Sequence, residues 1–313
     1  MPPVTHSPSA GRILVVRGGA LGDFILTLPV LAALREGFPG NRIEVLGYSN
    51  VTDLAVRSGM ADAARSIESR PLAGFFARGG ELDPSLSAYF AGFHLIISFL
   101  FDPDLIFRTN VGRISQAGFI QGPHRPDESL DRHATDQLLQ PLQQLAVFDP
   151  DAIPRIPRRP GDHSDTRAIA VHPGSGSERK NWPEDRWAGL LSELAADSER
   201  RFLLIGGEAE GDRLERLAGV VPTSAVEILR SRPLAEVSDR LSACRGFLGH
   251  DSGITHLAAA LGLPGIVLWG PSRLRVWHPR CARMEIIEAG DRLEELSVAT
   301  VARRVRERLP DWD

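Results

Sequence analysis

The sequence predicts an α/β protein with two domains, each built on a doubly wound parallel sheet. Three observations support this prediction. Short β-branched runs alternate with helical segments in both halves of the 313-residue chain, which is the pattern of a parallel sheet covered on both faces. Polar or glycine-rich loops follow several of the predicted strands. A stretch with four prolines, residues 148–166, separates the two halves and shows little apolar periodicity.

The first domain is predicted to span residues 12–150, after a disordered lead-in at 1–11. Its strands are expected at 12–17, 42–47 and 94–99, and its helices at 24–34, 51–58 and 131–147. Residues 71–91 and 103–113 are expected to be helix or loop, because neither shows a clear period. The turn GGALGD at 18–23 joins the first strand to the first helix.

Residues 151–166 are predicted to be a linker, and residues 167–313 the second domain. Its strands are expected at 167–172, 201–206, 226–229, 245–249, 266–269 and 284–287. Its helices are expected at 184–196, 209–218, 234–243 and 254–261, with a closing helix at about 293–309. Gly262 and Pro264 are expected to end the helix that starts after GHDSG.

Composition narrows the class of protein. With 42% hydrophobic and 24% charged residues, the chain is typical of a soluble globular protein. A net charge of −4 gives no reason to expect a nucleic-acid partner. No apolar run approaches the ~20 residues that span a bilayer, and the start has no secretory signal. Two cysteines without a CxxC pair predict no metal site and a reduced, cytoplasmic protein.

The basic residues are strongly biased toward arginine. Of the 36 basic residues, 35 are Arg, and Lys180 is the single lysine. A compact ammonium differs from a planar guanidinium in how it meets a ligand. The single lysine therefore suggests a position where arginine cannot replace a compact ammonium group.

That lysine lies in the loop PGSGSERKNWP, residues 173–183, after a predicted strand. Backbone N–H groups, the hydroxyls of Ser175 and Ser177, and the charge of Lys180 suit a diphosphate. The alternative is a polar surface turn over Trp182 and Trp187.

The segment GHDSGITH, residues 249–256, places Ser252 and Gly253 at the start of a helix. Unpaired N–H groups and the positive end of the helix dipole converge there, and glycine has no Cβ to keep an anion away. A phosphate fits that position. Asp251 and His256 are candidates for a sugar contact, although Asp is also a common N-cap and a helical His is usually structural.

Two further acids follow predicted strands. Glu208, after Gly206 and Gly207, is placed to accept hydrogen bonds from a ribose, or simply to lie at the positive end of a helix. Asp23, after the first glycine turn, is a candidate general base or an N-cap of the helix that follows.

Four motifs together resemble glycosyltransferase family 9, the ADP-heptose:lipopolysaccharide heptosyltransferases. They are GGALGD, HPGSGSERKNWPEDRW, IGGE and HDSGITHLAAALGLPGIVLWGPS, and they fall in the family's order over nearly the whole chain. The resemblance implies a GT-B fold, in which two Rossmann-like domains face each other across a cleft. The C-terminal domain would bind the nucleotide-sugar donor and the N-terminal domain the acceptor.

The resemblance also implies roles for individual residues. Asp23 would be the catalytic base, and transfer would invert the anomeric centre in one displacement without a metal or other cofactor. The donor-binding set would be Ser175 and Lys180 for the diphosphate, Glu208 for the ribose, Asp251 for the sugar, Ser252 and Gly253 for the phosphates, and His256 in support of Asp251. The acceptor-side candidates are Arg17, Gly22, Arg108 and Arg113, with Arg125 and Arg132 nearby in sequence.

The functional hypothesis is transfer of heptose, or a related sugar, from an ADP-sugar to a lipopolysaccharide or other surface-glycan acceptor. It would take place in the cytoplasm or at the inner face of the inner membrane. Residues 1–150 hold 12 Arg and no Lys against 15 Asp plus Glu, a balance of −3, which does not predict a basic acceptor surface. The alternatives are a GT-B enzyme that uses a UDP-sugar, such as a UDP-GlcNAc transferase or 2-epimerase, and a catalytically silent nucleotide-sugar-binding protein.

Overall fold

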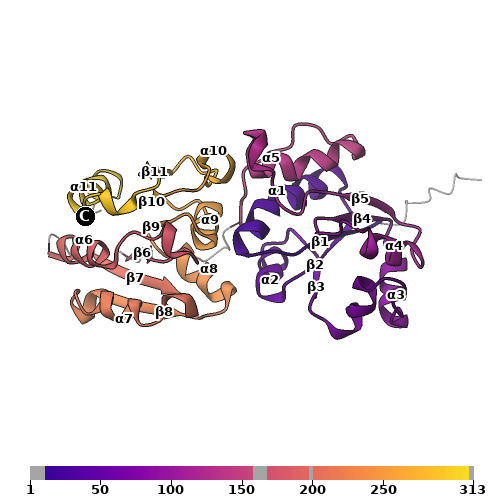
Figure 1. Cartoon of the computed structure of the whole chain (residues 1–313), viewed down its shortest axis with the longest axis horizontal. Helices are drawn as coiled ribbons and strands as arrows, with labels where there is room; N and C mark the ends of the chain where they lie inside the picture. The colour runs from indigo at the N-terminus through magenta and orange to yellow at the C-terminus, as the bar shows by residue number, and fades with distance from the viewer. Residues whose placement is uncertain (1–10, 158–167, 197–199, 310–313) are drawn as a thin grey trace, which may run out of the picture. The chain divides into compact units, whose positions relative to one another are not determined.

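The computed structural model describes residues 11–157, 168–196 and 200–309 (Figure 1). The predicted lead-in up to residue 10 and the linker from residue 158 onward lie outside these ranges. The chain divides into two compact units. The first comprises residues up to Gly19, Thr27–Asp127 and Thr135–Ala152, and the second comprises Ala20–Leu26, Glu128–Ala134 and the chain from Ile153 onward. Two short segments of the first half therefore group with the second unit.

The first unit contains a five-stranded parallel sheet in the order β3-β2-β1-β4-β5. Its strands are β1 (Arg12–Arg17), β2 (Arg42–Gly47), β3 (Ala63–Ser66), β4 (Leu95–Ser98) and β5 (Gly118–Gln121). In register, Ile13 lies beside Ile43 on one side and beside Leu95 on the other. The strands β1, β2 and β4 were predicted, and the short strands β3 and β5 were not.

The helices of the first half differ more from the prediction. They are α1 (Leu21–Gly37), α2 (Ser49–Arg57), η1 (Arg70–Phe76), α3 (Pro84–Ala91), α4 (Ile106–Gly112), η2 (Glu128–Leu130), α5 (Ala134–Leu139) and η3 (Gln140–Leu145). The helix predicted at 131–147 is wrong as a single element. Pro141 has no N–H to continue α5, and the chain tightens there into the 3₁₀ helix η3.

The second unit contains a six-stranded parallel sheet in the order β11-β10-β9-β6-β7-β8. Its strands are β6 (Ala168–His172), β7 (Arg201–Gly206), β8 (Val226–Arg230), β9 (Gly246–His250), β10 (Gly265–Trp269) and β11 (Met284–Glu288). All six were predicted to within about a residue. The central strands are apolar and buried on both faces, as expected where helices cover both sides of a sheet.

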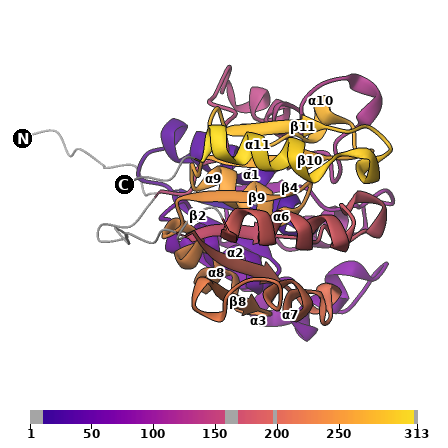
Figure 2. The ribbon, with the colours of Figure 1, turned by 90° about the vertical axis from the view of Figure 1, so that its left-hand side faces the viewer.

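The helices of the second unit lie on both faces of its sheet. They are η4 (Glu178–Lys180), α6 (Glu184–Ala196), η5 (Glu208–Glu210), α7 (Arg213–Ala218), η6 (Thr223–Ala225), α8 (Leu234–Ser242), α9 (Gly253–Ala260), α10 (Leu274–Trp277), η7 (Leu293–Glu295) and α11 (Val298–Arg308). The helix predicted at 209–218 begins only at Arg213, and the closing helix is divided into η7 and α11. Figure 2 shows α11 and α6 side by side, as their contacts require.

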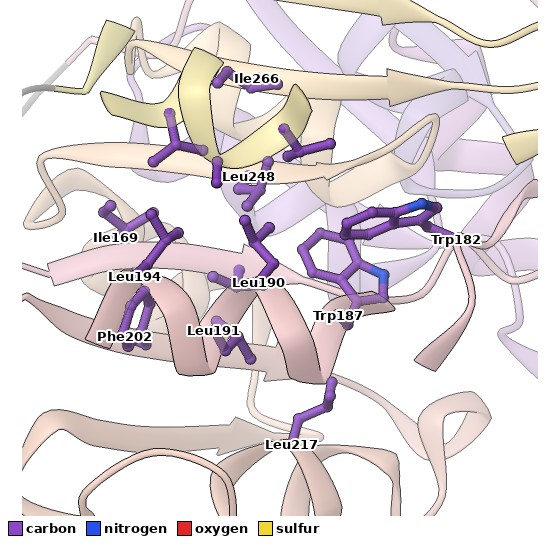
Figure 3. Packing of buried hydrophobic residues seen from close by; sticks show 14 of the residues in the cluster. Ile169, Trp182, Trp187, Leu190, Leu191, Leu194, Phe202, Leu217, Leu248 and Ile266 are labelled. Atoms are coloured by element: carbon purple, nitrogen blue, oxygen red, sulfur yellow. The ribbon is translucent and has the colours of Figure 1, made fainter. Parts of the chain in front are cut away.

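The core under α6 and α11 is built around two tryptophans (Figure 3). Trp182 and Trp187 are both buried, and their rings meet edge to face with centroids 5.3 Å apart. Leu190 and Leu194 continue this face along α6 against the strands. The loop that carries Lys180 is thus anchored on the core at its C-terminal end. No helix in the described part of the chain is long and apolar enough to cross a membrane.

Candidate active site

The loops that follow β6, β7 and β9 lie at one edge of the second sheet. These strands are neighbours and run parallel, so their carboxyl ends meet at that edge, where open α/β sheets bind their ligands. The predicted diphosphate loop, the Glu208 turn and the GHDSG turn are the three loops concerned. The fold therefore brings the donor-binding candidates together.

An ion pair between Lys180 and Asp251 joins two of these loops. Lys180 Nζ lies 2.7 Å from Asp251 Oδ2. The lysine side chain is 34% exposed and the aspartate side chain 9% exposed. The single lysine thus extends from the β6 loop to the start of α9, where a ligand can reach the ammonium while the carboxylate stays largely enclosed.

Helix α9 begins with a built cap. The Ser252 hydroxyl accepts a hydrogen bond from the Thr255 N–H at 3.2 Å, which satisfies one of the free donors of the first turn. The Thr255 hydroxyl donates to the carbonyl of His250. These contacts fix the turn that carries Asp251 and Gly253.

Gly253 is required for close packing at the same place. A Cβ at position 253 would lie 2.9 Å from Leu21 Cβ and 3.0 Å from Gly22 N. The segment Ala20–Leu26, part of the second unit, therefore lies directly against the start of α9. The place that a Cβ would take is thus filled by the first turn of α1, and binding of an anion by the backbone at Ser252 and Gly253 stays a prediction.

This packing brings Asp23 close to the donor-side candidates. Asp23 Oδ2 accepts a hydrogen bond from the Ala20 N–H at 3.0 Å, so the side chain does brace the first turn of α1. Asp23 and Asp251 are both near enough to His256 to favour its charged form. Burial nevertheless outweighs them and lowers the pKa of His256, which lies inside α9 with both carboxylates nearby.

Two more buried histidines support the β6 and β9 loops. His250 Nε2 accepts the Trp182 N–H at 2.8 Å, and His172 Nδ1 donates to the Ile205 carbonyl at 2.8 Å. Burial, and then the neighbouring His172, lower the pKa of His250 to about 3. Both rings are fully enclosed structural hydrogen-bonding groups that tie adjacent strand ends together.

The acid that the sequence analysis selected after β7 is exposed, and the buried one lies two residues later. Glu208 faces solvent, whereas Glu210 is buried and accepts the Gly207 N–H through Oε2 at 2.6 Å. A Cβ at Gly174 would overlap the Glu210 carboxylate. Glu210 therefore joins the β7 turn to the β6 loop. In the sequence, Glu210 could have been noticed only from the spacing GGxxE and from the small residue Gly174 in the facing loop.

Ser175 lies within the β6 loop and holds its shape. Its Oγ lies 2.9 Å from the Ser177 carbonyl and 2.7 Å from Asn181 Oδ1. Gly176 has a φ of +72°, which a residue with a side chain rarely adopts. The loop is thus a folded turn with the Ser175 hydroxyl hydrogen-bonded inside it.

The acceptor-side arginines lie in the first unit, and two of them are hydrogen-bonded to its backbone. Arg17 is buried, and its Nη1 donates to the carbonyls of His124 at 2.7 Å and Phe99 at 3.4 Å. Arg113 donates to the Gly80 carbonyl at 2.8 Å. Arg108 is exposed, with its guanidinium 5.5 Å from the centre of the Phe119 ring. The fourth candidate, Gly22, lies instead beside Gly253 in the second unit.

Among the described residues there is no group of three or more His, Cys, Asp or Glu side chains arranged to hold a metal ion. Cys244 is buried and Cys281 is half-buried, and both are free thiols. Burial raises the pKa of the Cys244 thiol to about 12.

Residues 118–300 match the sequence profile of glycosyltransferase family 9 (heptosyltransferase). Lipopolysaccharide heptosyltransferase 1 of Escherichia coli K12 is 22% identical over 309 residues, with 83% of this chain and 88% of that protein covered. The enzyme of the same name from Pseudomonas aeruginosa is 24% identical over 296 residues, covering 83% and 79%.

Solved structures of this family have the same fold. The E. coli ADP-heptose lps heptosyltransferase II superposes with a TM-score of 0.78 at 16% identity, covering 95% of this chain and 98% of that chain. An E. coli heptosyltransferase solved with ADP gives 0.72 at 20% identity, covering 95% and 99%. These likenesses confirm the prediction of two parallel-sheet α/β units of the GT-B type.

Proposed function

The chain belongs to glycosyltransferase family 9 (heptosyltransferase), and we propose that it transfers a heptosyl group from ADP-heptose to a hydroxyl of a lipopolysaccharide or another surface glycan. Membership of the family makes it a glycosyltransferase. The choice of donor is supported by the relatives, which are named as lipopolysaccharide heptosyltransferases, and by a related structure solved with ADP. We further propose that it acts in the cytoplasm or at the inner face of the inner membrane.

The observation that carries this proposal is the Lys180–Asp251 pair at the start of α9. In the donor complex, the ammonium of Lys180 neutralises the diphosphate, which is the leaving group. Ser252 and Gly253 offer backbone N–H groups to the phosphates, and Ser175 offers its hydroxyl. Asp251, released from the lysine, accepts hydrogen bonds from hydroxyls of the sugar.

The reaction proposed for this site is a single displacement with Asp23 as general base. The Asp23 carboxylate takes the proton of the acceptor hydroxyl while that oxygen forms a bond to the anomeric carbon. The bond from the anomeric carbon to the diphosphate oxygen breaks at the same time, and ADP leaves with the electron pair. Attack opposite the leaving group inverts the anomeric centre. Lys180 and the α9 N-terminus supply the positive charge, so we assign the reaction no metal.

The ribose contact is proposed to come from the β7 turn. Glu208 is exposed there, and its neighbour Glu210 holds the turn from beneath through the Gly207 N–H. Glu208 is therefore the carboxylate with free access to ribose hydroxyls.

The role of Asp23 is tested by the substitution Asp23→Asn. Asparagine still accepts the Ala20 N–H through its carbonyl oxygen, so the first turn of α1 is kept while the basicity is lost. We expect the rate of transfer from ADP-heptose to fall at least about a hundredfold, with the Kd for ADP nearly unchanged. The control is Asp53→Asn on the exposed side of α2. Undiminished transfer by Asp23→Asn removes it from the base role.

The choice of nucleotide is tested by a thermal-shift panel of ADP- and UDP-sugars. A ligand that binds the folded chain raises its melting temperature in proportion to RT ln(1 + [L]/Kd). We expect ADP-heptose to stabilise the chain and UDP-GlcNAc to have no effect. The reverse pattern supports the UDP-sugar alternative and refutes the proposed donor.

A further inference from the structure

A pair of exposed aromatic rings lies at the carboxyl edge of the first sheet. Phe101 follows β4 and is 71% exposed, far more than the buried Phe99 two residues earlier. Its ring lies 4.6 Å from the His124 ring, centre to centre, at an angle of 59°. His124 follows β5 and is also exposed. Because β4 and β5 are parallel neighbours, both rings belong to the edge where ligands of such sheets bind.

The two loops that carry these rings are tied together from below. Arg17, at the end of β1, donates through Nη1 to the carbonyls of both Phe99 and His124. Gln121 Nε2, at the end of β5, donates to the Leu100 carbonyl at 3.0 Å. Arg17, which was predicted to lie on the acceptor side, is therefore a buried support of this edge. These hydrogen bonds hold the two loops that carry Phe101 and His124.

The chain just after Phe101 is fixed as well. The Asp102 carboxylate accepts the N–H groups of Phe107 at 3.1 Å and of Arg108 at 3.0 Å, which caps the start of α4. Leu105 has a φ of +56° and is 46% exposed. A leucine rarely adopts the left-handed region, and such outliers concentrate at ligand-binding segments. The loop after Phe101 thus combines a capped helix start with a strained residue.

The charges beside the pair are of both signs. Asp102 and Asp104 lie in the Phe101 loop, and Asp104 is 3.8 Å from Arg78, with both side chains largely exposed. Arg125 is the basic residue next to His124. These two carboxylates and the guanidinium groups of Arg78 and Arg125 balance, so no excess of positive charge is present here to attract a phosphate group or an anionic lipid surface. A neutral partner with an apolar face is the better match.

We propose that Phe101 and His124 bind the face of an unphosphorylated sugar ring of the acceptor. The C–H face of a pyranose is apolar and packs flat on an aromatic ring, while its hydroxyls reach a neighbouring polar group such as the His124 imidazole. The inference deepens the proposed function, on which it rests, by naming what the acceptor presents at this edge. It gives an acceptor contact that needs no basic patch.

The test compares Phe101→Ala with Phe148→Ala, a matched control in the same unit that is 66% exposed. The probe is lipid-free core oligosaccharide of lipopolysaccharide, used with its phosphates intact and after chemical dephosphorylation. Binding is followed by saturation-transfer NMR on the wild-type chain and both variants, and transfer from ADP-heptose is measured in parallel. Phe101→Trp is the conservative variant.

We expect Phe101→Ala to weaken oligosaccharide binding and to raise the acceptor KM about tenfold, the loss of one aromatic stacking contact. Phe148→Ala and the Kd for ADP should not change, Phe101→Trp should restore binding, and dephosphorylation should not weaken it. Three results each overturn the inference: no oligosaccharide binding by the wild type, equal binding by Phe101→Ala, and binding that requires the phosphates. If the wild type binds oligosaccharide but does not transfer heptose, the proposed function fails while the aromatic contact stands.

Discussion

Replacing Lys180 with methionine separates what the lysine does for the fold from what it does for the donor. The pair with Asp251 has an N–O distance of 2.7 Å, with the carboxylate 9% exposed and the ammonium 34% exposed. Exposed pairs contribute about 0–1 kcal/mol, and breaking a fully buried pair costs about 3–5 kcal/mol. This pair is intermediate. Lys180→Met should therefore lower the free energy of unfolding by about 1–2 kcal/mol, because Asp251 is left enclosed and unpaired.

The second substitution, Asp251→Asn, is expected to act on stability and on ADP affinity in the direction opposite to Lys180→Met. Added to Lys180→Met, it removes the unpaired charge and should restore most of the lost stability. Alone, it frees the lysine from its carboxylate, so ADP should bind at least as tightly as to the wild type. Lys180→Met should weaken ADP binding about tenfold to a hundredfold with or without Asp251→Asn, the value of one charged hydrogen bond.

The assay is a urea titration followed by tryptophan fluorescence, with ADP affinity measured by calorimetry. All five tryptophans follow residue 181, so the fluorescence reports the second unit alone. Arg179→Met, a charge removed from the same 3₁₀ turn, is the control for net charge. The unfolding free energies of the two single variants and the double variant give the coupling energy between Lys180 and Asp251. A coupling energy near zero refutes the strength assigned to the pair. Weaker ADP binding by Asp251→Asn alone refutes the competition between carboxylate and diphosphate.

Two other predictions follow from burial at the same edge. The folded-state pKa of His250, about 3, lies below the unfolded value near 6.5, so its contribution to stability is complete above pH 6.5 and is lost toward pH 3. The unfolding free energy of the second unit should fall by about 1.4 kcal/mol between pH 7.5 and 5.5 on this account, and His250→Asn should flatten that slope in urea titrations at each pH. Gly253→Ala should reduce transfer severalfold and lower the melting temperature, because its Cβ meets Leu21 and Gly22 at about 3 Å. Gly219→Ala, whose Cβ has only ordinary contacts, should melt like the wild type, and equal behaviour of the two variants contradicts the packing at α9.

The parts of the fold that the sequence predicted well are those where local pattern and tertiary role agree. The strand β7 is a short apolar run between polar turns, and it begins and ends where expected. The strand β3, AARS, has no apolar run and lies at the edge of its sheet, half exposed. Only its pairing with β2 makes it a strand. The break at Pro141 was visible in the sequence, because proline has no N–H to continue a helix, and the single helix predicted at 131–147 did not take it into account.

The candidate site likewise contains some residues that local sequence patterns predict and others that they do not. Lys180 and Asp251 were each found from a strand-end loop, and parallel pairing of β6 with β9 explains why they meet. Glu210 was missed because its partners, Gly207 and the backbone near Gly174, become visible only when two loops are folded together. The contact of Leu21 with Gly253 joins residues more than two hundred positions apart. No local pattern predicts such a contact.

His256 lies near both Asp23 and Asp251, the residues proposed as the general base and the sugar contact. Asp23 and Asp251 both favour an imidazolium at this position, and burial opposes them as the largest single effect on its pKa. Asp251 already has Lys180 as its cation, with an N–O distance of 2.7 Å, and burial disfavours an imidazolium as a second cation beside it. The buried position of His256 in α9 therefore leaves Lys180 as the cation next to Asp251 in the donor site proposed here.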